Sequence, residues 1–231
     1  MTLREHTSHE FEAELTTVRR RILEMGRHVD EVLESSGEAL RKHDSELGKR
    51  IILGDQQTNS MELEIDRLCL EILARRQAVA GDLRLLTSAL KVVVDLERIG
   101  DLAVNIAERV VELGSESPLT SYEDLLRMMT TAREMLKEAL AALENQDVGR
   151  ASRVIDKDEV VDAYYTQIFN DVLNRMREDP DNIFRATRVQ AISRYIERVG
   201  DHAVNVAERV IFIVTGNDIR HLSRMQRSDL S

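Results

Sequence analysis

The chain has 231 residues, of which 42% are hydrophobic, 32% are charged and only 3% are aromatic. Its formal net charge of −10 argues against a nucleic-acid-binding protein, because contact with phosphate backbones normally needs a basic surface. The single cysteine, Cys69, excludes an intramolecular disulfide and a cysteine-rich zinc site.

Apolar residues recur every three or four positions along almost the whole chain, which is the period of amphipathic α-helices. Breaks fall at Gly81–Asp82, in the segment 114–121 with Pro118, and in the segment 178–182. Gly26 and Gly37 lie inside the first segment and weaken the expectation of one straight helix there. We predict an all-α protein with six long helices, at about 7–43, 46–77, 82–113, 119–145, 147–178 and 181–215.

Neither the first residues nor any apolar run predicts a signal peptide or a membrane-spanning helix. The first fifteen residues lack the apolar core of a signal peptide, and no run of about 18 apolar residues exists. We expect a cytoplasmic protein, with peripheral association at a membrane surface left open.

The third and sixth predicted helices carry nearly the same fifteen residues. Glu97–Val111 reads ERIGDLAVNIAERVV, Glu197–Ile211 reads ERVGDHAVNVAERVI, and 11 of the 15 positions are identical. Earlier in each half, Arg50–Asn59 can be aligned with Arg153–Asp162 at an offset of 103 positions. An internal duplication explains both matches. We therefore expect two tandem, similar three-helix bundles, spanning residues 1–115 and 116–231.

The duplicated stretch places acidic side chains along one face of each helix. At 100° per residue, Glu97, Asp101 and Asn105 fall within a sector of about 80°. The second copy repeats this stripe, and the preceding helix of each half adds carboxylates or amides four residues apart. The full set of candidate ligands is Glu97, Asp101, Asn105, Asp55, Glu197, Asp201, Asn205, Asp158 and Asp162, with Asn59, Glu62 and Asp66 as further members on the second segment.

Crowded, half-buried carboxylates destabilise a fold unless a cation neutralises them. Oxygen ligands suit hard or borderline ions, so we expect iron, manganese, magnesium or zinc at these stripes. The simpler interpretation is a solvated charged face neutralised by Arg98 or Arg109. The duplication repeats the whole acidic face together with Gly100 and Gly200, and this favours metal binding over a solvated face.

Catalysis is not expected, because the chain lacks the paired Glu-x-x-His motifs of di-iron helical bundles. It also lacks a glycine-rich phosphate loop and a nucleophile elbow. His202, which follows Asp201, is interpreted as a surface or packing residue. A carboxylate-bridged metalloenzyme and a purely structural helical bundle stay as alternatives.

The duplicated motifs, Glu97–Asp101 and Glu197–Asp201, resemble the E/D-x-x-x-D motifs of the PhoU family of phosphate-transport accessory and phosphate-regulon regulatory proteins. Further similarity is found in the segments 11–26, 75–86 and 216–221. The resemblance implies metal ions on the carboxylate motifs. Glu62 aligns with Tyr165, which leaves the two metal sites free to differ in ligand number.

The resemblance also implies a non-enzymatic negative regulator of phosphate uptake and of the phosphate-starvation response. Such a regulator would act in the cytoplasm, as a homodimer, between the ATPase subunit of the high-affinity phosphate ABC transporter and a phosphate-sensing histidine kinase.

Overall fold

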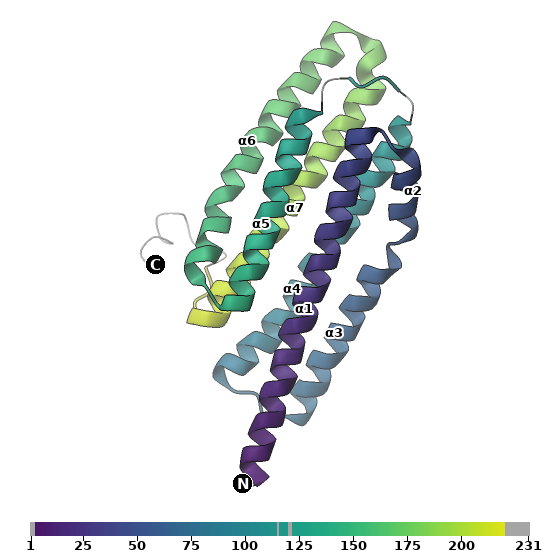
Figure 1. Ribbon diagram of the computed structural model, residues 1–231. Helices are drawn as coiled ribbons and strands as arrows, with labels where there is room; N and C mark the ends of the chain where they lie inside the picture. Colours follow the sequence, from purple (N-terminus) through teal and green to yellow (C-terminus); the bar gives the residue numbers. More distant parts are fainter. Residues whose placement is uncertain (1–2, 115, 120–121, 220–231) are drawn as a thin grey trace.

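The computed structural model describes residues 3–114, 116–119 and 122–219, and all regular structure in these ranges is helical (Figure 1). Arg220 and His221 of the tail that resembles the PhoU family lie outside them. The predicted all-α class is confirmed. The elements in chain order are α1 (Leu3–Lys42), α2 (Ser45–Leu53), α3 (Gln56–Arg75), α4 (Ala80–Leu113), α5 (Glu123–Asn145), α6 (Val148–Glu178), a 3₁₀ turn at Pro180–Asn182 and α7 (Ile183–Thr215).

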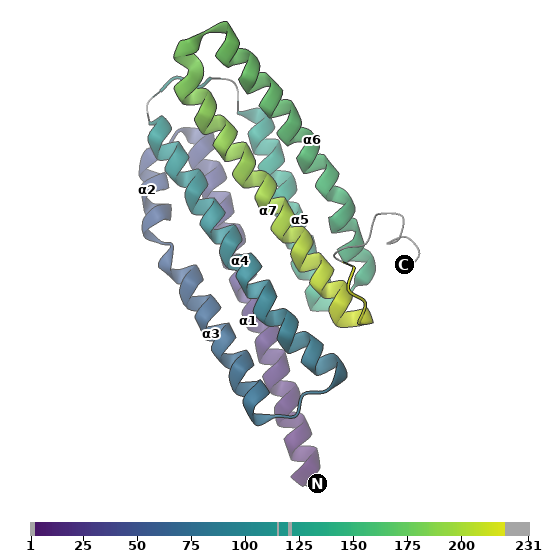
Figure 2. The same ribbon diagram turned by 180° about the vertical axis from the view of Figure 1, so that it is seen from behind.

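The helices form two elongated bundles that lie side by side along their length (Figures 1 and 2). In the first, α1 and α4 pack with the α2–α3 pair, and in the second, α5 and α7 pack with α6. The bundles meet where α4 packs against α7 and α1 against α5, and α4 runs antiparallel to α7. The α2–α3 pair and α6 therefore occupy opposite outer flanks (Figure 2). None of the helices in the described ranges is long and apolar enough to cross a membrane.

The contact between α1 and α5 shows that the two halves are related by an approximate two-fold axis. A Cβ atom added to Gly26 would lie 2.5 Å from a methyl carbon of Leu140, and one added to Gly37 would lie 3.5 Å from Cγ of Met129. Met129 follows Gly26, and Leu140 follows Gly37, at the same offset of 103 positions seen in the sequence. The two glycines inside α1 do not break the helix. Gly26 admits Leu140 of α5 in a close crossing, whereas Gly37 faces Met129 at an ordinary van der Waals distance.

The second predicted helix, 46–77, is divided in the structure into α2 and α3, which meet at Gly54 and Asp55. The backbone N–H of Gly54 donates to the carbonyls of Arg50 and Ile51, so the last turn of α2 tightens and ends there. Its counterpart in the second half, α6, is continuous through Lys157, which aligns with Gly54. The break is thus a feature of the first half alone.

The apolar face of the duplicated stretch forms part of the core, as its periodicity predicts. Side chains of α4 and α7 that follow the helical repeat are at most 3% exposed, namely Ile99, Leu102, Ala103, Ile106, Val110, Val199, Ala203, Val206 and Val210. Burying each of the leucine, isoleucine and valine side chains among them stabilises the fold by roughly 1.5–3 kcal/mol. This packing fixes the rotation of α4 and α7, and so determines where their acidic faces point.

Candidate metal centre

The first acidic groove lies between α3 and α4, where a glycine permits close approach. A Cβ atom on Gly100 would lie 2.9 Å from Cγ2 of Thr58, so α3 could not pack at this distance against a larger residue. The approach brings the polar face of α3 onto the acidic face of α4. We define the first groove by Asp55, Asn59, Glu62, Asp66, Glu97 and Asp101.

Carboxylates in the first groove influence each other's ionisation. Burial raises the pKa of Asp55, and the negative charge of Asp101 raises it further. Burial is also the main cause of the raised pKa of Glu97, followed by the charge of Asp101, while Arg98 opposes the shift. Glu62 has a pKa raised by burial, then by the charges of Asp66 and Asp101. Because these charges act across the two helices, Asp55 and Glu62 must lie close to Glu97 and Asp101.

Three oxygens of the first groove are buried without a hydrogen-bond partner: Asn59 Oδ1, Asp66 Oδ1 and Glu97 Oε2. Arg98 Nε lies 3.3 Å from Glu97 Oε2, within ion-pair distance but without hydrogen-bond geometry. Arg98 donates properly to Asp101 Oδ2 at 2.9 Å. Its side chain is 54% exposed, so solvent screens this compensation. The first groove therefore contains more buried oxygen atoms than the guanidinium of Arg98 neutralises.

The second acidic groove lies between α6 and α7 and consists of Asp158, Asp162, Glu197 and Asp201. A Cβ atom on Gly200 would lie 3.1 Å from Asp158 Oδ1, so the carboxylate sits directly against the bare backbone of α7. Burial, followed by the charges of Asp162, Asp201 and Glu197, raises the pKa of Asp158 to about 7. Glu197 accepts a hydrogen bond from Arg194 at 2.7 Å through Oε1, whereas its Oε2 is buried and unpaired.

The two predicted asparagine ligands differ in their contacts. Asn205 donates from Nδ2 to Asp95 Oδ1 at 3.0 Å, and His202 Nδ1 lies 2.8 Å from the same oxygen. This cluster joins α7 to α4 between the bundles, and the partly buried His202 makes a polar contact there. Asn105 is half-buried one turn beyond Asp101, and none of the hydrogen bonds found in the described residues ties it to the first groove.

The donor set of both grooves fits a hard cation. Among the described residues, no three or more His, Cys, Asp or Glu side chains already surround one point as metal ligands. The unpaired buried oxygens could serve as ligands of a cation, and each acceptor left unmet in the fold costs about 1–3 kcal/mol. Glu62 and Asp66, which the sequence already offered as further candidate ligands, are four residues apart and so lie on the same face of α3.

Comparisons with known proteins agree with this architecture. The family model described as PhoU domain matches residues 22–110 and again residues 125–210, so each bundle matches it once. The phosphate-specific transport system accessory protein PhoU homolog of Pseudomonas putida is 40% identical over 96% of this chain and 87% of its own length. The accessory protein PhoU of Escherichia coli K12 is 36% identical over 96% of this chain and 92% of its own length.

Two solved structures share the fold. The crystal structure of PhoU from Pseudomonas aeruginosa has a TM-score of 0.86 and 39% identity, covering 90% of this chain and 100% of that one. The structure of the phosphate transport system regulatory protein PhoU from Streptococcus pneumoniae has a TM-score of 0.85 and 29% identity, covering 90% and 98%. With a family model that matches both bundles and relatives that match nearly the full length, the chain belongs to the PhoU family.

Proposed function

We propose that this chain is an accessory protein of phosphate-specific transport that lowers phosphate uptake and represses the phosphate-starvation response when phosphate is plentiful. The names of its relatives support the link to phosphate transport. In this proposal the chain is a non-enzymatic adaptor. It acts in the cytoplasm as a homodimer and contacts the ATPase subunit of the phosphate ABC transporter and a phosphate-sensing histidine kinase. Its association with the membrane is peripheral.

The observation that carries the proposal is the pair of acidic grooves, one on each bundle. In the first groove Glu97 and Asp101 would hold a metal ion with Asp55 and with the oxygens of Asn59 and Asp66. In the second groove Asp158, Asp162, Glu197 and Asp201 would do so. A bound ion would supply positive charge, and iron, manganese, magnesium and zinc all accept carboxylate oxygens. Neutralising these carboxylates would hold α3 against α4 and α6 against α7, and so give each outer flank a defined surface for a partner.

Metal content tests the grooves directly. Purified wild-type protein, dialysed against each metal and then against buffer, should retain metal by elemental analysis. Asp101→Ala with Asp201→Ala should lose it while far-ultraviolet circular dichroism stays helical. A matched control is Glu64→Ala, an exposed carboxylate of α3 outside the groove. Equal metal content in the double variant and the wild type would show that Asp101 and Asp201 are not needed to bind the metal.

A cellular assay tests the regulatory role. Deleting the gene should raise alkaline phosphatase activity in cells grown with ample phosphate, and a plasmid copy of the wild type should lower it again. The Asp101→Ala, Asp201→Ala variant should restore repression poorly, whereas Glu64→Ala should restore it fully. Unchanged alkaline phosphatase after the deletion would count against a negative regulator, whatever the grooves bind.

A further inference from the structure

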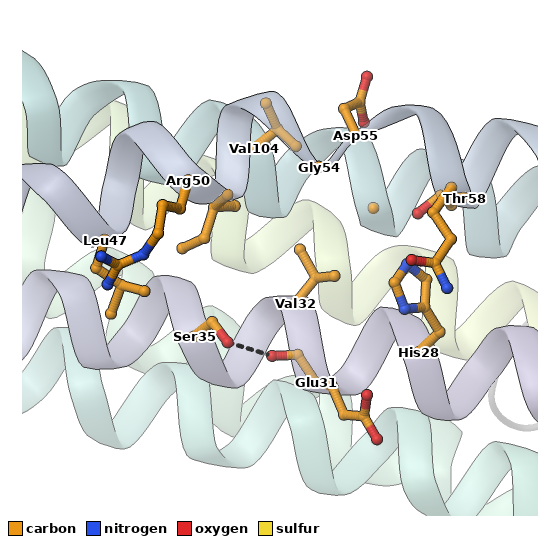
Figure 3. Close-up of a pocket in the computed structure, with 13 residues that line it drawn as sticks. His28, Glu31, Val32, Ser35, Leu47, Arg50, Gly54, Asp55, Thr58 and Val104 are labelled. Atoms are coloured by element: carbon orange, nitrogen blue, oxygen red, sulfur yellow. Dashed lines mark hydrogen bonds between the residues drawn. The ribbon is translucent and has the colours of Figure 1, made fainter.

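The break between α2 and α3 opens a cavity of about 300 Å³ between α1, the α2–α3 junction and α4 (Figure 3). Its apolar lining includes Val32, Leu47, Ile51 and Val104. Gly54 lies on its rim and is exposed, whereas Thr58 on its inner wall is buried. The cavity is therefore accessible from solvent, and its volume is at the lower end of the range of about 300–1,000 Å³ found for small-molecule sites.

The basic side chains of this cavity face inward, and the acidic ones face away from it. Figure 3 shows Arg50 at one end and His28 at the other, both in the gap between α1 and the α2–α3 junction. Glu31 and Asp55 turn their carboxylates away from that gap. Arg50 takes part in none of the ion pairs found in the described residues, and His28 Nε2 is buried without a hydrogen-bond partner. A solvent-exposed guanidinium outside any of these ion pairs and a buried imidazole nitrogen without a hydrogen-bond partner therefore border an aliphatic surface.

The second bundle fills the equivalent space with its own side chains. At the offset of 103 positions, Val32 corresponds to Met135, whose Cε lies 3.7 Å from a Cβ atom built on Gly200. Gly54 corresponds to Lys157, and the ammonium group of Lys157 forms an ion pair with Glu134, the counterpart of Glu31.

A second pair closes the rest of that space in the second bundle. Arg150 and Glu138, at the positions of Leu47 and Ser35, are joined by an ion pair of 3.3 Å. The cavity is thus not a general consequence of the fold. It exists because the first bundle has small or apolar residues where the second has ion pairs.

We propose that this cavity binds a small organic anion, with its oxyanion group on Arg50 and a short aliphatic body on Val32, Ile51 and Val104. Arginine suits this role because its guanidinium donates to two oxygens of a carboxylate or a phosphate. His28 then supplies a hydrogen bond to a polar group at the far end of the ligand. This binding does not depend on the regulatory role or on metal in the grooves.

A ligand in the cavity would affect the side chains of the first acidic groove and not those of the second. Asp55 and Thr58 line the cavity, while Asp55 also belongs to the groove and Thr58 packs on Gly100 between Glu97 and Asp101. The second groove has no such neighbour within the described second bundle, since Lys157 and Glu134 occupy that place. The ligand would therefore make the two metal sites inequivalent.

Isothermal titration calorimetry on the full-length, metal-free protein in chelator tests the proposal. The probes are pentanoate and n-butyl phosphate, which carry the same butyl chain on different oxyanion groups. Inorganic phosphate lacks the butyl chain, and 1-butanol lacks the charge. At least one of the first two should bind saturably, and more tightly than the last two. If 1-butanol bound as tightly as the two organic anions, the anion assignment would be wrong. If inorganic phosphate bound as tightly as they do, the aliphatic subsite would be wrong. If no probe bound, the cavity would not be a binding site.

Two variants locate the ligand. Arg50→Gln should weaken binding about tenfold or more, as for loss of a charge-assisted hydrogen bond. Arg153→Gln, at the equivalent position of the second bundle, is the matched control and should bind as the wild type does. Gly54→Lys copies the lysine of the second bundle and should close the cavity by pairing with Glu31. A Cβ atom at Gly54 meets nothing closer than 3.5 Å, so this variant should fold. Wild-type affinity in Arg50→Gln or in folded Gly54→Lys would place the ligand elsewhere.

Discussion

Replacing Asp158 by asparagine should make the metal-free protein more stable at neutral and alkaline pH. The change keeps the size of the side chain but removes one of the charges that crowd the second groove. The pKa of Asp158 rises from its ordinary value of 3.8 to about 7, chiefly through burial and then through Asp162, Asp201 and Glu197. At roughly 1.4 kcal/mol per pKa unit, this difference corresponds to about 4 kcal/mol of unfolding free energy at pH 8.

The pH dependence has a definite sign. Between about pH 4 and about pH 7, native Asp158 keeps a proton that the unfolded chain releases, so stability falls as pH rises through this window and levels off above it. Below pH 4 the side chain is protonated in both states. The advantage of Asp158→Asn should therefore be largest at pH 8 and nearly vanish at pH 4.

Urea unfolding followed by circular dichroism at several pH values, in chelator, measures this difference. Asp171→Asn, an exposed position on the same helix, should behave like the wild type at every pH. With saturating Mn²⁺ the order should reverse, because a ligand that binds only the native state stabilises it and the variant has lost a ligand oxygen. If metal-free Asp158→Asn were no more stable than the wild type at pH 8, repulsion in the second groove would not be the strain that we infer.

Further predictions concern the helix crossing and the thiol. Gly26→Ala should lower the unfolding free energy by about 1–3 kcal/mol, because its Cβ would overlap both methyl carbons of Leu140. Gly37→Ala meets only ordinary contacts and should raise the unfolding free energy by about 0.5–1 kcal/mol. Urea unfolding measures both, and a similar loss in the two variants would contradict the close crossing at Gly26. Burial, followed by the charge of Asp66, raises the pKa of the Cys69 thiol to about 12. Iodoacetamide at pH 8 should therefore alkylate this thiol only after unfolding, as mass spectrometry would show. Rapid alkylation of the native protein would contradict the burial of the thiol.

The helices and the duplication could be predicted from the sequence because both depend on local periodicity. Placing Glu97 and Asp101 on one face needs only the geometry of one helix, and the apolar residues opposite them are buried as that geometry requires. The i, i+4 spacing on α3 likewise identified the groove's other wall. These features depend on residues close together in the chain.

Features that depend on packing between the bundles could not be predicted in this way. Asn205 has the same position in its helix as Asn105, yet it turns to Asp95, a contact set by how α7 crosses α4. Gly54 gave no clear signal, because a single glycine is compatible with a continuous helix, as Gly26 and Gly37 demonstrate in α1. Whether a glycine breaks a helix or admits a neighbour is determined by the tertiary contact.

The most direct test of the acidic grooves is the location of bound metal in crystals of the full-length protein loaded with Mn²⁺. Anomalous diffraction should show one peak between α3 and α4 beside Glu97 and Asp101, and another between α6 and α7 beside Asp158 and Asp201. Anomalous peaks only at other places, or none in crystals whose grooves are ordered and open to solvent, would contradict the account that these duplicated carboxylates are built around a cation.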